Sequence, residues 1–324
     1  MEGKKVNIRP LFEACGMDLG DLEIIETPGM YPYKETIEEN WAYFTTVGSQ
    51  RLKEQFEKEH KKTSTIGIVG ICSGVEGIAI SHIFGGGLKR LIVTDIDQEI
   101  LEGTITNIKN ATALLSYELI PLVGLFCEPI ESSGHTVDFV HANIPNLPTS
   151  GEEDLSKGDQ KGSFAPPEYY EKYRPPKEFI YWALAAQYAY LQSAKRVIKP
   201  GGSVIAELGG RVPFELVEEL FDSCGLELQE VIIGFKEQTE AMINFRGYHH
   251  NEVEYGVQFE YYTYDESKYM FEKYQLANPN YNISGRELKK LLKPYKLNAG
   301  QAMEAYKKGT RIGHLVHLLR GMKN

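Results

Sequence analysis

The chain of 324 residues is poor in cysteine and tryptophan, with four of the first and two of the second. The cysteines show no C-x-x-C spacing and no histidine pair beside them, so the sequence predicts neither a zinc site nor a disulfide framework. Isolated thiols of this kind are typical of a reducing compartment, and we expect a cytoplasmic protein. The cysteines are Cys15, Cys72, Cys127 and Cys224.

Long apolar runs and an excess of basic residues are also missing. No segment approaches the roughly 18 apolar residues of a membrane-spanning helix, and no apolar signal core opens the chain, so no membrane partner is expected. Lys and Arg number 35 against 45 Asp and Glu, which gives a formal net charge of -10. Because phosphate backbones require a Lys/Arg face, this charge disfavours nucleic acid as the main partner.

Apolar runs that end in glycine or aspartate alternate with helical patterns from residue 65 onward. Such alternation predicts an α/β fold whose mostly parallel sheet is covered by helices on both faces. Seven strands are expected, at 65–70, 91–94, 118–123, 137–141, 203–207, 227–235 and 257–264. Intervening helices are expected at 76–84, 98–110, 177–198 and 214–223.

Three regions are predicted. Residues 1–62 form a helical cap, residues 63–265 form the core, and residues 266–324 form a helical extension that covers the site or makes a homodimer contact. Within the core, the Pro-, Gly- and acid-rich stretch 143–176 is expected to be a lid over the substrate. The extension is expected to hold helices at 284–292, 299–307 and 313–319.

The turn after the first strand carries the first chemical signal. Its glycines allow a ligand to approach the backbone closely, and the second strand ends about 20 residues later in Asp95, which can accept hydrogen bonds from ribose hydroxyls. The glycine turn and Asp95 together predict a nucleotide-like cofactor, and nicotinamide cofactors are also bound by such a turn and carboxylate. The residues expected to bind the cofactor are Gly70, Cys72, Ser73, Gly74, Gly77, Asp95, Ile96 and Asn143.

Three further features separate methyl transfer from hydride transfer. The turn is irregular, with Cys72-Ser73 before Gly74; the fourth strand ends in Asn143-Ile144-Pro145-Asn146; and Lys199-Pro200-Gly201-Gly202 precedes the fifth strand. This combination resembles the Rossmann-like, class I S-adenosylmethionine-dependent methyltransferases. Amide N-methyltransferases of the release-factor type have Asn-Pro-Pro-Tyr at the end of the fourth strand. This chain has Asn146 where they have the tyrosine, which argues against methylation of a planar amide nitrogen.

A second resemblance covers about residues 130–320. The stretches that carry it are 178–181, 197–200, Leu208-Gly209-Gly210-Arg211, Phe259-Glu260-Tyr261-Tyr262 and 305–314. They are similar to the methyltransferase portion of plant methionine S-methyltransferase, whose stand-alone bacterial relatives make S-methylmethionine, in some cases toward dimethylsulfoniopropionate. The resemblance implies a small amino-acid substrate and S-adenosylmethionine as the cofactor.

Such a reaction needs no catalytic base, because a thioether has no proton to lose. The expected site therefore lacks a catalytic residue in the strict sense and depends on positioning. An arginine would bind the substrate carboxylate, and aromatic rings would lie near the sulfur atoms. The candidates for substrate binding are Pro145, Tyr181, Tyr188, Arg211 and Arg246. The neighbouring His249-His250 has no spaced third ligand, so no metal site is expected.

Two other functions stay open from the sequence. The first is a methyltransferase that acts on the nitrogen of a small amine or amino acid, or on a protein glutamine amide. The second is a module that kept the fold but only binds a partner.

Overall fold

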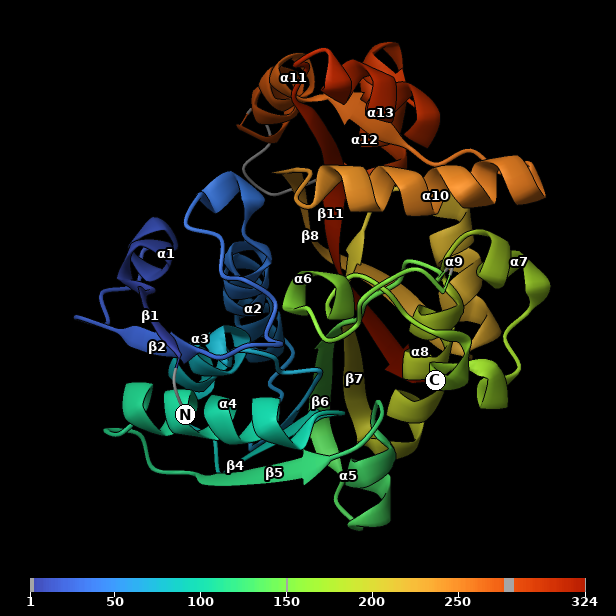
Figure 1. The fold of residues 1–324 in the computed structure, drawn as a ribbon. Coiled ribbons are helices and arrows are strands. Elements are labelled where there is room, and N and C mark those ends of the chain that lie inside the picture. Colours follow the sequence, from blue (N-terminus) through green and yellow to red (C-terminus); the bar gives the residue numbers. More distant parts are fainter. Residues whose placement is uncertain (1–2, 150, 277–282, 324) are drawn as a thin grey trace.

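The computed structural model describes residues 3–149, 151–276 and 283–323 (Figure 1). A nine-stranded sheet forms its centre, in the order β10-β9-β11-β7-β6-β3-β4-β5, with β8 paired to β11. The strands are β3 (Thr65–Val69), β4 (Arg90–Asp95), β5 (Glu118–Val123), β6 (Val137–Asn143), β7 (Ile198–Gly209), β8 (Leu226–Glu237), β9 (Tyr261–Thr263), β10 (Lys296–Leu297) and β11 (Ile312–Lys323). Strands β3 to β7 pair in parallel, whereas β11 is antiparallel to β7, β8 and β9.

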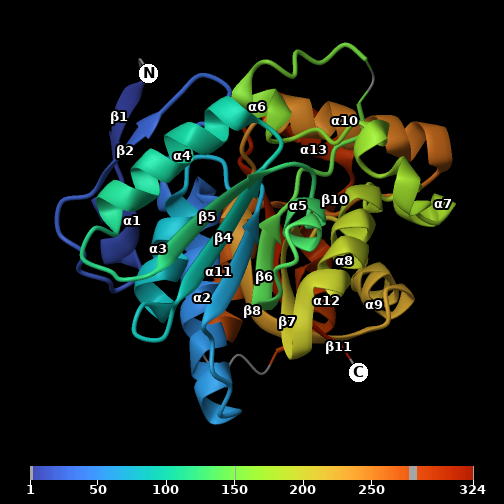
Figure 2. The ribbon, with the colours of Figure 1, turned by 90° about the horizontal axis from the view of Figure 1, so that it is seen from below.

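Helices cover both faces of this sheet, and each face has its own apolar core. Figure 2 shows the two groups of helices on opposite sides of the strands. One face is covered by α2 (Trp41–Lys58), α3 (Val75–Phe84) and α4 (Gln98–Ala111). The other is covered by α5 (Glu128–Ser132), α8 (Ala185–Val197) and α9 (Phe214–Ser223). The predicted mostly parallel α/β sheet with helices on both faces is thus confirmed, with nine strands in place of seven.

The remaining elements lie before β3, between β6 and β7, and after β7. A two-stranded antiparallel sheet joins β1 (Lys4–Asn7) to β2 (Glu23–Glu26), so the expectation of a helical cap over residues 1–62 was wrong in its first part. The other helices are α1 (Arg9–Ala14), α6 (Gly158–Lys161), α7 (Lys177–Tyr181), α10 (Ala241–Tyr255), α11 (Tyr264–Leu276), α12 (Gly285–Leu292) and α13 (Ala299–Lys307). Short 3-10 turns occur at η1 (Ile37–Glu39), η2 (Pro167–Tyr169), η3 (Glu171–Tyr173) and η4 (Lys293–Tyr295). No helix in the described ranges is long and apolar enough to cross a membrane.

The last strand corrects a second expectation. A helix was predicted over 313–319, but these residues lie in β11, which pairs with β7 on one side and β8 on the other. Every residue from Ile312 to Gly321 is buried, because helices cover both faces of the strand. A strand buried on both faces is apolar along its whole length, so it lacks the two-residue alternation of apolar and polar side chains that distinguishes a strand from a helix.

Two smaller corrections concern helix 177–198 and strand 257–264. The helix is interrupted between α7 and α8, where Ala183 has a φ of 54°. The strand is only the three-residue β9. The helices expected at 284–292 and 299–307 are present as α12 and α13. The division at residues 62 and 265 stays a prediction.

Candidate cofactor and substrate site

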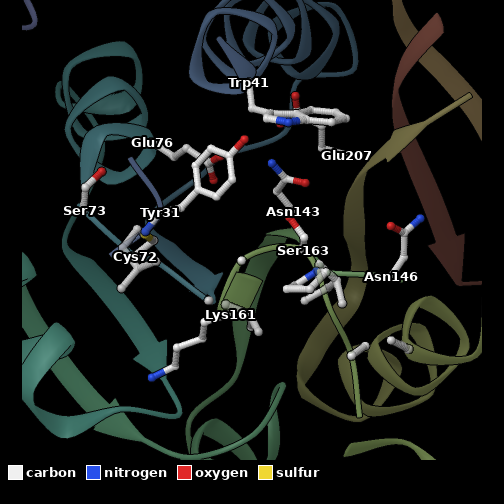
Figure 3. Close-up of a pocket in the computed structure, with 18 of the residues that line it drawn as sticks. Tyr31, Trp41, Cys72, Ser73, Glu76, Asn143, Asn146, Lys161, Ser163 and Glu207 are labelled. Atoms are coloured by element: carbon white, nitrogen blue, oxygen red, sulfur yellow. The ribbon is translucent and has the colours of Figure 1, made fainter. Parts of the chain in front are cut away.

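A cavity of about 240 Å³ lies at the carboxyl ends of β3, β4, β6 and β7. This is the edge of an open α/β sheet at which ligands bind. Figure 3 shows side chains from separate elements gathered around this space. The cavity is bordered by the turn at 69–76, by residues 95–96 and 143–146, by the end of β7 and by two further segments, 29–42 and 161–169.

The turn after β3 is shaped by left-handed backbone positions. Gly70 has a φ of 67° and Cys72 a φ of 49°, and the N–H groups of Gly70 and Ile71 donate to the carbonyl of Thr94 at 2.9 and 3.1 Å. A Cβ on Gly70 would meet no atom within 4 Å, so the backbone is open to the cavity at this point. A ligand can therefore approach the chain there more closely than at any residue with a side chain.

Gly74 and Gly77 serve a different purpose from the one predicted. Neither borders the cavity. A Cβ on either would press on Ile108 of α4, so these glycines allow α3 and α4 to pack closely. The structure thus brings Gly70, Cys72, Ser73, Asp95, Ile96 and Asn143 to the cavity but not these two glycines.

Asp95 is positioned by the backbone of both turns beside it. Its Oδ2 accepts from the Cys72 N–H at 3.2 Å and its Oδ1 accepts from the Asp97 N–H at 3.1 Å. Burial raises the pKa of this carboxyl. The next residue, Ile96, is 38% exposed and borders the cavity with an apolar side chain.

The Cys72 thiol joins this turn to the segment before α2. Its Sγ accepts from the Tyr31 N–H at 3.1 Å. Burial, followed by the charge of Asp95, raises the pKa of the thiol to about 12, so it is not a nucleophile near neutral pH. The four cysteines are all free, as the sequence predicted.

Arg211 provides a buried positive charge at the other end of the cavity. It is 4% exposed, and its guanidinium donates to Gln238 Oε1 at 3.0 Å and faces His314 Nε2 at 2.8 Å and the Tyr248 hydroxyl at 3.5 Å. It also lies 5.9 Å from the ring centroid of Trp41. Within the described ranges, no carboxylate forms an ion pair with Arg211, although Arg is rarely buried without one.

Two neighbours on β8 and β11 add to this environment. Burial, with the charge of Arg211, lowers the pKa of His314 well below its usual value, so its ring is neutral. Lys236 is fully buried 5.0 Å from the Trp41 ring, and burial lowers the pKa of its amine to about 7. Both effects mark a region in which further positive charge is unfavourable and an anion would be stabilised.

A cluster of acidic and imidazole groups was not foreseen from the sequence. Glu76 on α3, His141 on β6 and Glu207 on β7 place ligand atoms within 4.8 Å of one another, and His141 Nε2 lies 3.0 Å from Glu76 Oε2. Glu207 accepts a hydrogen bond from the Thr45 hydroxyl. Burial, and then the charge of Glu76, raises the pKa of Glu207 well above its usual value. The position of both strand residues near carboxyl ends was the signal that could have revealed them.

Aromatic rings that were not among the predicted site residues border the cavity. Tyr31, Tyr33 and Trp41 precede or begin α2, and Tyr169 lies in the stretch predicted as a lid. The Tyr31 hydroxyl contacts Thr239 and Glu240 across the opening. The expected aromatic surface thus exists, but other residues form it.

Pro145 borders the cavity, as do Ile144 and Asn146 beside it. Three other predicted substrate ligands do not. Tyr181 stacks on Tyr255 with centroids 4.3 Å apart, and Tyr188 packs on Phe179 at 5.7 Å. Arg246 is an exposed residue of α10 outside the cavity.

Comparisons with known proteins add a likeness of fold. No family model and no curated protein matches the sequence. A precorrin-6y C5,15-methyltransferase from Geobacter metallireducens shares 9% identity and a TM-score of 0.40, over 91% of this chain and 94% of that one. The YcgJ protein of Bacillus subtilis shares 10% identity and a TM-score of 0.39, over 85% and 98%. A ribosomal protein L11 methylase from Lactobacillus delbrueckii shares 15% identity and a TM-score of 0.35, over 61% and 73%. These sequence identities and TM-scores are too low to indicate a function, so the function has to be inferred from the residues of the cavity.

Proposed function

We propose that the chain is an S-adenosylmethionine-dependent methyltransferase whose acceptor is the thioether of free L-methionine. The observation that carries the proposal is that one cavity joins a glycine turn and a carboxylate placed to bind ribose to a buried arginine, for which the described part of the chain offers no acidic partner. The first half suits an adenosyl cofactor, and the second suits the carboxylate of an amino acid.

The residues at the first half fit S-adenosylmethionine. Each Asp95 oxygen accepts one backbone hydrogen bond, and because an ionised carboxylate offers about four lone-pair sites, two remain for ribose hydroxyls. Ile96 supplies an apolar surface for the base, and the open face of Gly70 leaves room for the rest of the cofactor. Asn143, at the end of β6, adds an amide beside that turn.

The cofactor would supply a methyl group on a sulfonium. In the proposed reaction the lone pair of the methionine sulfur forms the new S–CH₃ bond while the cofactor's S–CH₃ bond breaks and its electron pair stays on the departing sulfur. No proton moves, so the residues of this chain only bind, orient and exclude water. Rings that border the cavity, such as those of Tyr33 and Tyr169, can stabilise a sulfonium through their faces.

Asp95→Asn is expected to weaken S-adenosylmethionine binding about tenfold, because the amide keeps the shape but loses a charged acceptor for the ribose. Calorimetric titration measures the change. Asp222→Asn, at an exposed position on α9, is the matched control and should bind as the wild type does. Equal affinities for the two variants would contradict the role of Asp95.

Methylation of nitrogen is the second candidate, and one observation favours it. An ammonium or amide must lose a proton when it is methylated, and Glu76 and Glu207, which border the cavity, could accept it. A protein glutamine amide fits less well, because Asn143-Ile144-Pro145-Asn146 offers no ring for the amide to stack on.

One assay separates these functions. The protein is incubated with S-adenosylmethionine and, in parallel, free L-methionine, a set of small amines and a glutamine-containing peptide. We expect S-methylmethionine, detected by mass, as the product. A methyl group found only on an amine or on the peptide would refute the thioether assignment, and absence of cofactor binding would refute both enzymatic functions.

A further inference from the structure

The cavity carries two opposite charges that lie close together but do not pair. The negative one is the acidic pair, Glu76 and Glu207, and the positive one is Arg211. A charged group removed from water in this way is normally offset by an ion pair with a group of the opposite charge. Within the described ranges, Glu76 pairs only with His141, and neither Glu207 nor Arg211 takes part in an ion pair.

Glu207 is the member of the acidic pair that has a carboxylate oxygen without a hydrogen-bond partner among the described residues. Its side chain is 0% exposed, its Oε2 accepts from Thr45, and its Oε1 has no hydrogen-bond partner among the described residues. It borders the cavity, and Asn143 lies directly opposite it in the β6–β7 pairing. A buried carboxylate oxygen without a partner costs free energy, which a cation or hydrogen-bond donor in the cavity would offset.

The local geometry of β7 places the two charges on one side of the sheet. Glu207 and Gly209 are two apart on a strand, so their side-chain directions coincide. The guanidinium of Arg211 folds back to the place that a Cβ on Gly209 would occupy. The positive group therefore lies two strand positions from Glu207, on the same face, and the two form no ion pair.

We propose that Glu207, supported by Glu76, binds the α-ammonium of a free amino-acid acceptor whose carboxylate Arg211 binds. This rests on the proposed function and names the acceptor class: a zwitterionic α-amino acid, since its two charged groups are adjacent as these side chains are. Peptide-bound residues lack one or both charges and are excluded. His141 is a positioning residue, because it contacts Glu76 and does not border the cavity.

A divalent metal is the alternative occupant of the acidic pair and His141. Two features favour the ammonium. His141 Nε2 already faces Glu76 at 3.0 Å, and the nearby guanidinium of Arg211 and amine of Lys236 would repel a dication more strongly than a single charge.

The test compares L-methionine with 4-(methylthio)butanoate, which has the same thioether and carboxylate but no ammonium. Binding of each is measured by calorimetry in the presence of S-adenosylhomocysteine, so that no turnover is needed. In wild type, methionine should bind about 20-fold more tightly than the analogue, and in Glu207→Gln this preference should fall to about twofold. Glu219→Gln, an exposed residue of α9, is the control and should keep the full preference.

A stability measurement guards against a variant that merely misfolds. Thr45, Glu76, His141 and Lys236 face Glu207 from α2, α3, β6 and β8. Because the pKa of Glu207 is raised in the folded protein, the free energy of unfolding falls as pH rises above about 4.5, where the unfolded chain ionises. Glutamine does not ionise, so ligand-free Glu207→Gln does not lose this part of its free energy of unfolding. Its melting temperature should exceed that of the wild type by a margin that grows from pH 5 to pH 8.

Three outcomes would overturn the proposal. The first is an unchanged preference for methionine in Glu207→Gln. The second is a loss of S-adenosylmethionine affinity in that variant with methionine binding intact, since the ammonium concerned would then be that of the cofactor. The third is methionine binding that disappears with EDTA and returns with Mn²⁺ or Zn²⁺. Methionine binding that depends on Glu207, without methyl transfer, would refute the proposed function and leave this inference standing.

Discussion

Arg211→Met is expected to raise the KM for methionine several hundred-fold while the Kd for S-adenosylmethionine changes less than about twofold. The guanidinium is buried and no acid among residues 3–149, 151–276 and 283–323 forms an ion pair with it, so a substrate carboxylate would be its charged partner. Removal of one member of a buried charge pair costs about 3–4 kcal/mol, which corresponds to this factor. Steady-state kinetics give the KM, and calorimetry gives the cofactor affinity.

Two further variants make this result specific. Arg211→Lys keeps the charge but loses the planar fork, and it should recover only part of the affinity. Arg286→Met removes an exposed arginine that pairs with Glu215 and Glu218, and its kinetics should match the wild type. An equal rise in the cofactor Kd and the methionine KM for Arg211→Met would indicate general damage to the cavity and contradict the role of this residue.

Gly70→Val should weaken S-adenosylmethionine binding about 100-fold or more. Gly70 has a φ of 67° and its Cβ position faces open space in the cavity, so a valine side chain would fill the volume proposed for the cofactor. The same change also strains the backbone, because a β-branched residue at positive φ is unfavourable. The two effects have to be separated.

Gly134→Val is the control that separates the backbone strain from the filling of the cavity. Gly134 has a φ of 73°, it is exposed after α5, and a Cβ there also meets no atom within 4 Å. Gly134→Val therefore carries the same backbone strain without an effect on the cavity. The melting temperatures of both variants should fall by similar amounts, and only Gly70→Val should lose the cofactor. Similar cofactor affinities for the two would show that the open face of Gly70 is not used.

The parallel half of the sheet and the glycine turn were predictable from local patterns. Buried strands such as β3 end at a glycine or aspartate, and Gly70 and Asp95 follow from that ending. The strand β11 was not predictable, because uniform burial erased the period that separates strand from helix. Its identity depends on pairing with β7 and β8, which are distant in the sequence.

The substrate end was predicted less well, and the reason is geometric. Tyr181 and Tyr188 were expected on one continuous helix, 177–198, but the helix is interrupted at Ala183, where φ is positive, and the two rings pack in different places. Trp41 and Tyr31 were missed because nothing local in residues 1–60 marks them as ligands. They reach the cavity only because α2 packs against the sheet.

The place of β11 has a consequence for how the protein is made. The turn at Gly70 and the strands up to Asn143 leave the ribosome well before His314, the residue on β11 that contacts Arg211. At typical rates of translation, roughly 10 to 30 s separate the end of β6 from the start of β11. A nascent chain therefore has the strands that border the cofactor turn before it has the strand that fixes Arg211. The surroundings of Arg211 are therefore complete only after β11 has inserted between β7 and β8.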